Sequence, residues 1–262
     1  MEPNQYDLMY QQEDRHWWYL GMRRIAEKLL ERYFCARSGR PEVLDAGCGS
    51  GGTTAWLGRW GTVSGLDIAP EALDLARQRG IKRLVRGSID ALPFCSERFD
   101  LVASFDVLYH LRVKDDDQAL SEFHRVLRPG GMLLVRAPAH DWLRGAHDQA
   151  VHTRHRYHRN ELATKLRASG FAVRRVSYAN WLLFPFAPAK RLLEREDPAG
   201  CIDLWQPPAP LNRLLGGLLG LEAEPIARLG LPWGLSVVAV GQKPRPPGPV
   251  STLPPVRIAG QA

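Results

Sequence analysis

The chain has 262 residues, of which 45% are hydrophobic and 24% are charged, so it is long enough to bury one sizeable core. It contains no apolar run of the roughly 20 residues that a membrane-spanning helix needs, and its polar first residues argue against a secretory signal, so we expect a cytoplasmic protein. The formal net charge of +7 permits nucleic acid or an anionic small molecule as a partner, although the arginines are spread along the chain.

Strands and helices alternate from residue 42 to residue 138. Short apolar runs predict buried strands, and segments with apolar residues at helical spacing predict helices between them. The strands are expected at 42–46, 62–68, 82–86, 99–105 and 132–137, and the helices at 53–59, 70–79 and 116–127. This alternation predicts βαβ units and a mostly parallel sheet.

The flanking segments differ from this central part. The N-terminal segment is helical in pattern and carries the aromatic run HWWY at residues 16–19, which either packs on the core or covers a cofactor. After residue 138 we expect a helix at 160–169 with Asn160 as its N-cap, a strand at 171–176, a helical insertion at 181–233 and a last strand at 235–240.

Together these patterns predict an α/β fold with a Rossmann-like, seven-stranded, mostly parallel sheet and flanking helices. The chain then divides into four parts: an N-terminal helical lid at 1–40, a cofactor-binding core at 41–180, a helical insertion with the last strand at 181–241 that serves as a substrate cap, and a disordered proline-rich tail at 242–262.

A glycine-rich turn follows the first predicted strand and opens a helix. Gly47, Gly49 and Gly52 satisfy the spacing G-x-G-x-x-G, which alone cannot identify the cofactor. Asp45 distinguishes between the possible cofactors. A carboxylate there would repel the pyrophosphate of a dinucleotide but attract a cofactor that carries a sulfonium and an ammonium group. Asp67, at the end of the second strand, can accept hydrogen bonds from ribose hydroxyls in either kind of cofactor.

Five motifs, in this order along the chain, resemble those of the class I S-adenosylmethionine-dependent methyltransferases. Within that class they resemble the methyltransferase type 11 group. They are VLDAGCGSGG, GLDIAPEALDLAR, GSIDALPF, FDLVASFDVLYHL and RVLRPGGMLLV, and they cover roughly residues 40–138. The N-terminal EDRHWWYLGMRR and the later HDQAVHTRHRY resemble a bacterial subgroup of this family that carries HWW near its start.

The resemblance implies S-adenosylmethionine as the cofactor and S-adenosylhomocysteine as its product. In the implied site, Asp45 and the glycine turn hold the methionine part, Asp67 holds the ribose, and Asp90 meets the adenine amino group. The full set of implied cofactor-binding residues is Asp45, Ala46, Gly47, Cys48, Gly49, Asp67, Ile68, Ser88, Ile89, Asp90, Ala91 and Phe105.

Three residues that follow the fourth strand are the catalytic candidates. The same resemblance implies that Asp106, directly after this strand, faces the reacting atoms. His110 is a candidate general base or substrate ligand, and Tyr109 is a weaker one, since a methyl acceptor that must lose a proton needs a base. A packing or capping role stays an alternative for His110.

A basic segment, HTRHRYHR at residues 152–159, lies on the same predicted edge of the sheet. Arginine forks suit a carboxylate or a phosphate, although a solvated basic loop is an equal alternative. The candidate substrate-binding residues are Trp17, Trp18, Arg23, His152, Arg154, His155, Arg156 and Tyr157. We expect no metal site, because these histidines have no obvious carboxylate or cysteine partner. The four scattered cysteines give no zinc pattern either.

The sequence therefore predicts methyl transfer to a small, anionic metabolite, such as a phosphorylated isoprenoid or an aromatic acid. Two alternatives stay open: an RNA methyltransferase, which the net charge of +7 permits, and a non-catalytic protein that binds the cofactor or a partner. A homodimer also stays open.

Overall fold

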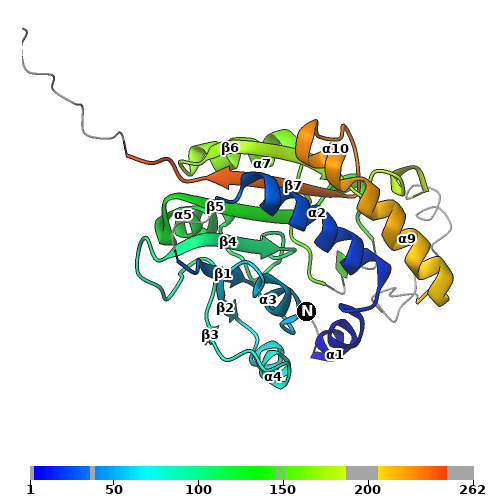
Figure 1. Ribbon diagram of the computed structural model, residues 1–262, viewed down its shortest axis with the longest axis horizontal. Helices are drawn as coiled ribbons and strands as arrows, with labels where there is room; N and C mark the ends of the chain where they lie inside the picture. Colours follow the sequence, from blue (N-terminus) through cyan, green and yellow to red (C-terminus); the bar gives the residue numbers. More distant parts are fainter. Residues whose placement is uncertain (1–2, 36–38, 146–147, 150, 187–205, 247–262) are drawn as a thin grey trace, which may run out of the picture.

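The computed structural model describes residues 3–35, 39–145, 148–149, 151–186 and 206–246. Seven strands form one sheet in the order β3-β2-β1-β4-β5-β7-β6, in which β7 is antiparallel to both of its neighbours (Figure 1). The strands are β1 (Glu42–Ala46), β2 (Thr62–Asp67), β3 (Leu84–Arg86), β4 (Phe99–Phe105), β5 (Leu127–Pro138), β6 (Ala172–Ala179) and β7 (Ser236–Gln242). The predicted Rossmann-like, mostly parallel sheet is confirmed.

Helices flank this sheet on both faces (Figure 1). The helices are α1 (Pro3–Gln12), α2 (Trp17–Tyr33), α3 (Gly52–Leu57), α4 (Pro70–Gln78), α5 (Asp116–Val126), α7 (Arg159–Ala168), α9 (Ala209–Leu221) and α10 (Ala223–Arg228), with short 3₁₀ turns η1 (Asp141–Leu143) and η2 (Phe184–Phe186). Among these described helices, none combines the length and the apolar character that crossing a bilayer requires.

Two local predictions differ from the structure. Helix α7 begins at Arg159, and its N-cap is His158 rather than Asn160; the backbone N–H of His158 donates to the Glu161 carboxylate at 3.2 Å. Strand β5 begins at Leu127, five residues earlier than expected, because Leu127 pairs with Phe99 of β4 across an irregularity in the register. Helix α5 thus ends at Val126, before the glycines, and regular pairing with β4 resumes at Met132.

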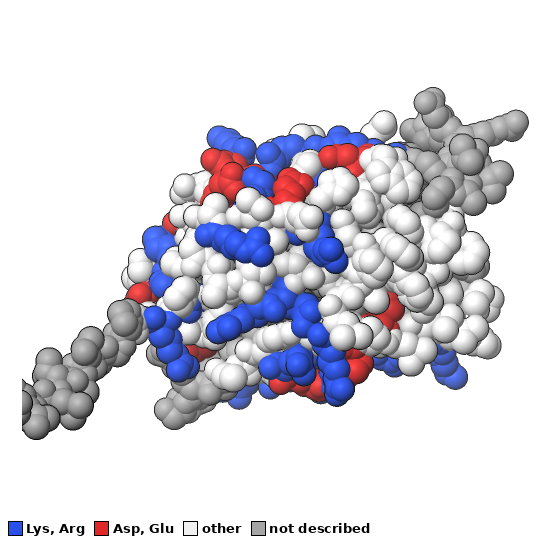
Figure 2. Space-filling model, turned by 90° about the horizontal axis from the view of Figure 1, so that it is seen from above, with Lys and Arg blue, Asp and Glu red and all other residues white. Residues whose placement is uncertain are grey.

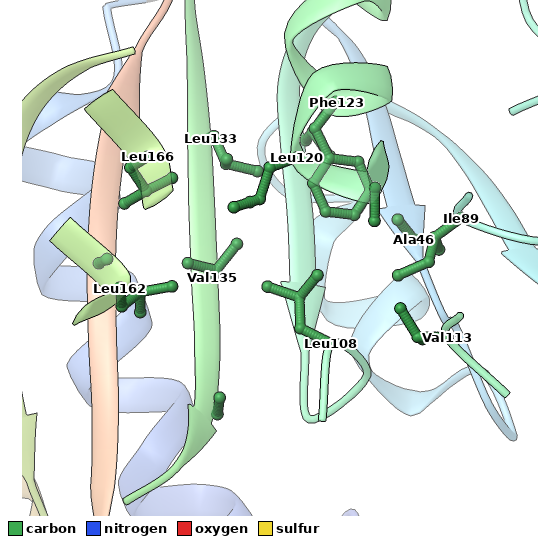
Figure 3. Close-up of a cluster of buried hydrophobic side chains, with 14 of the residues drawn as sticks. Ala46, Ile89, Leu108, Val113, Leu120, Phe123, Leu133, Val135, Leu162 and Leu166 are labelled. Carbon is green, nitrogen blue, oxygen red and sulfur yellow. The ribbon is translucent and has the colours of Figure 1, made fainter. Parts of the chain in front are cut away.

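Helices α5 and α7 cover one face of the sheet. Alternate residues of β5 point to opposite faces, and Leu133 and Val135 point to this one. Their partners across the interface come from both helices, as Figure 3 shows, and include Leu120, Phe123, Leu162 and Leu166. Both faces of β5 are buried, which explains its nearly continuous apolar sequence.

Helix α2 covers the opposite face together with α9 and α10. Its buried side chains Met22, Ile25 and Leu29 pack with Leu134 of β5 and with Leu219 of α9. The predicted insertion thus supplies two described helices that lie against α2; its residues 187–205 are outside the described part. The proposed tail begins at Gln242, which still pairs in β7, and its residues 247–262 are also outside the described part.

Because α2 packs its buried side chains against the sheet, we expect this helix to contribute to the stability of the core. Replacing Leu29, which is fully buried, with alanine removes apolar contact and leaves a cavity, so Leu29→Ala should lower the free energy of unfolding by about 2–5 kcal/mol. Urea denaturation measures this change. Leu229→Ala is the matched control, because Leu229 is 82% exposed and its loss should change little. Equal effects of the two substitutions would contradict the assignment of α2 to the core.

Candidate active site

The carboxyl ends of β1, β2, β4, β5 and β6 meet at one edge of the sheet, since these five strands run parallel to one another. Open α/β sheets bind ligands at this edge. At the end of β1 the chain turns sharply at Gly47, whose φ is +93°. A Cβ on Gly47 would lie 2.2 Å from the Cγ2 of Val107, so only glycine fits between the turn and the segment after β4.

Asp45 lies beneath this turn and is 1% exposed. Its carboxylate accepts a hydrogen bond from the Thr54 hydroxyl at 2.6 Å. Burial, together with the nearby carboxylates of Glu13 and Asp67, raises the pKa of Asp45 to about 7, against the hydrogen bond from Thr54, which lowers it. A cation bound here would favour the ionised carboxylate.

Asp67, at the end of β2, also contacts the glycine turn. One carboxylate oxygen accepts from the Gly49 N–H at 2.9 Å, and the other accepts from the Ala69 N–H at 3.0 Å. Burial raises the pKa of Asp67, whereas these backbone bonds lower it. Cys48 and Ala46, both buried, complete this part of the predicted cofactor site.

Glu13 is a site residue that the sequence analysis missed. Its carboxylate accepts from the Ser50 hydroxyl at 2.6 Å and from the Gly52 N–H at 3.1 Å, and it pairs with Arg79 at 2.9 Å. It therefore occupies the start of α3, where a dinucleotide-binding protein would hold its pyrophosphate. No local pattern marks Glu13, because its partners lie 37 or more residues away.

The segment after β3 brings together the residues predicted to frame an adenine ring. Ile89 is buried, and the Ser88 hydroxyl accepts from the Asp90 N–H at 3.3 Å. One oxygen of Asp90 accepts from the Lys114 N–H at 3.1 Å, and the other, Oδ1, is buried without a hydrogen-bond partner among the described residues. Ala91 and Ile68 are exposed at this rim. Asp90 thus has one oxygen available for a donor on a ligand.

Phe105 and Asp106 end β4 beside a buried arginine. The Arg136 guanidinium donates to Asp106 at 2.8 Å from Nε, and it lies 4.8 Å from the ring centre of Trp18 and 5.0 Å from that of Phe105. Arg136 therefore brings the predicted residues Trp18, Phe105 and Asp106 together through an ion pair and two cation–π contacts. No sequence pattern marks Arg136, because this residue is embedded in the apolar run of β5.

The other catalytic candidates lie in the segment after β4. Tyr109 is buried, and burial, followed by the charges of Asp106 and Asp148, raises the pKa of its hydroxyl, which favours the protonated form. Burial lowers the pKa of His110 to about 4, helped by His152 and Arg112, so its imidazole is neutral at physiological pH. The Nδ1 of His110 accepts from the Arg112 N–H at 3.1 Å.

Most of the basic segment is engaged in internal contacts. Arg156 pairs with Asp148 at 2.8 Å, and His155 contacts both Asp141 and Glu161. The Tyr157 side chain is fully buried and donates from its hydroxyl to Asp116 at 2.6 Å. Arg154 pairs with Asp116 at 3.4 Å, but its buried Nε has no hydrogen-bond partner among the described residues. Of the predicted arginines here, Arg154 has the most donor capacity left.

The other predicted substrate-binding residues lie in different surroundings. The His152 ring lies 5.8 Å from the His110 ring. Trp17 lies against the core, and its backbone N–H donates to the Asn212 side chain of α9. Arg23 pairs with Asp14 at 3.2 Å at the surface of α2. A substrate-binding role for these residues stays a prediction.

Comparison with known proteins identifies residues 44–135 as matching the family model described as a methyltransferase domain. The methyltransferase GfsG of Streptomyces halstedii is 37% identical over 121 residues, which are 43% of this chain and 42% of that protein. The malonyl-[acyl-carrier protein] O-methyltransferase of Enterobacter lignolyticus is 38% identical over 126 residues, 46% of this chain and 47% of that protein. The chain thus spans about half the length of these relatives.

A solved structure is similar over nearly the whole chain. It is a methyltransferase from Haloferax volcanii in complex with the Trm112 methyltransferase activator, with a TM-score of 0.59 and 21% identity, covering 93% of this chain and 94% of that one. At this identity the similarity shows a shared fold.

The raised pKa of Asp45 predicts a pH-dependent stability. Between about pH 4 and pH 7 the folded protein retains a proton at Asp45 that the unfolded chain has released. The free energy of unfolding should therefore fall as the pH rises through this window, by up to about 1.4 kcal/mol per pH unit from this group. Asp45→Asn should remove this contribution, and urea denaturation at a series of pH values measures the difference between wild type and variant. A difference that does not change with pH would contradict the prediction.

Proposed function

From the premise that this chain belongs to the class I S-adenosylmethionine-dependent methyltransferases through its domain at residues 44–135, we propose that it transfers a methyl group to a small molecule. The observation that carries the proposal is the group of buried carboxylates around the glycine turn, namely Glu13, Asp45 and Asp67. Such a group suits a ligand with positive charge at its methionine end, and it opposes the phosphates of a dinucleotide.

The residues present fit this cofactor. Asp45 and the turn at Gly47 would hold the methionine part, and Asp67 would accept from the ribose hydroxyls. The unpartnered Oδ1 of Asp90 offers an acceptor for the adenine amino group, and buried Ile89 offers an apolar surface for the ring. When bound, the cofactor supplies a methyl group on a sulfonium, and the chain's residues orient the acceptor for an in-line displacement.

A small-molecule acceptor is supported by the distribution of charge. The positive net charge does not correspond to a continuous basic surface on the face in Figure 2, where basic and acidic side chains are interspersed and a broad part is uncharged. Several of the arginines near the site are paired with carboxylates, including Arg136, Arg154 and Arg156. Nucleic acid would need phosphate contacts from unpaired basic groups.

The direct test is calorimetric titration of the protein with S-adenosylmethionine and S-adenosylhomocysteine. Asp67→Asn should weaken both by at least about tenfold, or ~1.4 kcal/mol, because the carboxylate is a charged acceptor for the ribose. Asp74→Asn is the matched control, since Asp74 lies exposed on α4 and pairs with Arg77 at the surface. Urea denaturation checks that both variants fold. Absence of binding to either compound by the folded wild type would overturn the proposal.

The finer proposal is that the acceptor is an anion, such as a phosphorylated isoprenoid or an aromatic acid. The incompletely bonded Arg154 supports it, because a guanidinium binds carboxylate or phosphate through paired hydrogen bonds. One relative is named for transfer to an oxygen of malonyl-[acyl-carrier protein], which is an acidic acceptor.

Arg154→Gln should therefore raise the KM for an acidic acceptor more than that for its neutral counterpart. With 4-hydroxybenzoate and its methyl ester as the matched pair, we expect a rise of about tenfold for the acid alone, since a charge-assisted bond is worth roughly 1.5–3 kcal/mol. Steady-state rates of S-adenosylhomocysteine formation measure it. An equal change for acid and ester would contradict the assignment of Arg154 to anion binding.

A further inference from the structure

Four of the parallel strands are followed by a residue with a positive φ at the carboxyl edge. Gly47 follows β1, Asp106 follows β4 with φ of +59°, His140 lies two residues after β5 with φ of +63°, and Asn180 follows β6 with φ of +63°. Asp, Asn and His tolerate this conformation better than most residues, but it is still uncommon outside glycine. Such conformations persist where the direction of a side chain matters.

His140 and Asn180 lie on either side of one turn. The Ala139 N–H donates to the carbonyl of Leu235 at 2.9 Å, which fixes the chain before His140 against the start of β7. Gly234 lies so close to β6 that a Cβ on it would be 2.3 Å from the carbonyl oxygen of Ala179. The turn before β7 thus brings the residues after β5 and those after β6 to the same place.

Three polar atoms at this place are buried without hydrogen-bond partners among the described residues. They are the Nε2 of His140, the Oδ1 of Asn180 and the Nε1 of Trp181. His140 is 9% exposed and Asn180 is 4% exposed, so water satisfies these atoms poorly. An unsatisfied buried polar atom destabilises the folded protein, and a ligand with matching groups would remove that cost.

Three aromatic rings lie around the His140 side chain. The His140 ring stacks on Tyr178 with 4.9 Å between ring centres and an angle of 20° between planes. Phe184 and Trp142 lie 5.6 Å and 6.0 Å from the His140 ring. A flat, conjugated ligand gains more from such surroundings than a flexible one does, since aromatic pairs favour stacked and edge-to-face contact.

The environment of His140 leaves Nε2 as a hydrogen-bond acceptor. Burial lowers the pKa of the imidazole, and the facing groups His158 and Arg156 lower it further, so the ring is neutral at physiological pH. A hydrogen bond with the backbone of Gly234 raises this pKa, which means that the imidazole is the donor in it. Because Nε2 has no partner, the donor is Nδ1–H, and Nε2 carries a lone pair.

We propose that His140 is the general base for a flat phenolic acceptor, whose polar edge is held by Asn180 and Trp181. The proposal rests on the methyltransferase function above and names the acceptor class of that same site. The phenolic oxygen bonds to the methyl carbon while the carbon–sulfur bond breaks, with its electron pair staying on sulfur. The phenolic proton passes to Nε2 of His140 and from there to solvent, so charge and atoms balance.

The experiment uses 4-nitrophenol, whose phenolate is coloured, with the full chain in complex with S-adenosylhomocysteine. If Nε2 accepts the phenolic proton, the bound probe should ionise about one pH unit below the free probe. His140→Gln should remove this shift, whereas His124→Gln, which changes a histidine that packs on Phe171 and does not contact His140, should retain it. Asn180→Gly preserves the positive φ and should weaken binding of the probe several-fold.

Methyl transfer gives a second readout. With unsubstituted phenol as the acceptor, which unlike 4-nitrophenol keeps its proton at neutral pH, His140→Gln should lower the rate of anisole formation by about a hundredfold or more, with S-adenosylhomocysteine affinity unchanged. If the complex binds neither 4-nitrophenol nor 4-nitroanisole, the proposal is overturned, while binding of S-adenosylhomocysteine keeps the proposed function intact. An unchanged ionisation of bound probe in His140→Gln also overturns it. Failure of wild type to bind S-adenosylhomocysteine overturns both.

Discussion

Three carboxylates share one poorly hydrated volume beneath the glycine turn, and much of the surrounding structure follows from that constraint. Burial raises the pKa of Glu13, Asp45 and Asp67, the charges of Glu13 and Asp67 also raise that of Asp45, and hydrogen bonds from hydroxyl or backbone donors act against burial at each. Because Glu13 comes from the N-terminal segment, the same contacts attach α1 to the cofactor side of the sheet. The negative charge of this group by itself favours the binding of a cationic ligand and disfavours the binding of phosphate.

The carboxyl edge of the sheet divides into two chemically distinct halves. The half formed by β1 and β2 is acidic and built on glycine. The half formed by β5 and β6 is aromatic, with buried histidine and asparagine atoms that have no hydrogen-bond partner in the described part of the chain. Asp106, at the end of the central strand β4, lies between them and is held by Arg136. A methyl donor in the first half and an acceptor in the second would meet near this ion pair.

Net charge is a poor guide to the surface of this protein. The segment 152–157 contains most of a conspicuous basic run, yet its charged side chains largely meet carboxylates of the same chain, as in the pairs of Arg156 with Asp148 and of Arg154 with Asp116. These pairs attach the segment to α5 and to the 139–148 region. Basic residues that satisfy internal carboxylates contribute to the sum of charges but not to a surface that attracts polyanions.

The sequence by itself determined the order of strands and helices along the chain and the position of Asp45 and Asp67 beside the glycine turn, because β1, the turn and Asp67 are local patterns within 26 residues. It could not determine the positions of Glu13, Arg136, His140 and Asn180. Glu13 meets Ser50 across 37 residues, and the turn at Gly234 meets Ala179 across the insertion. Such contacts depend on how α1 and β7 dock on the sheet, and that docking is decided by packing of the whole core and not by any local propensity.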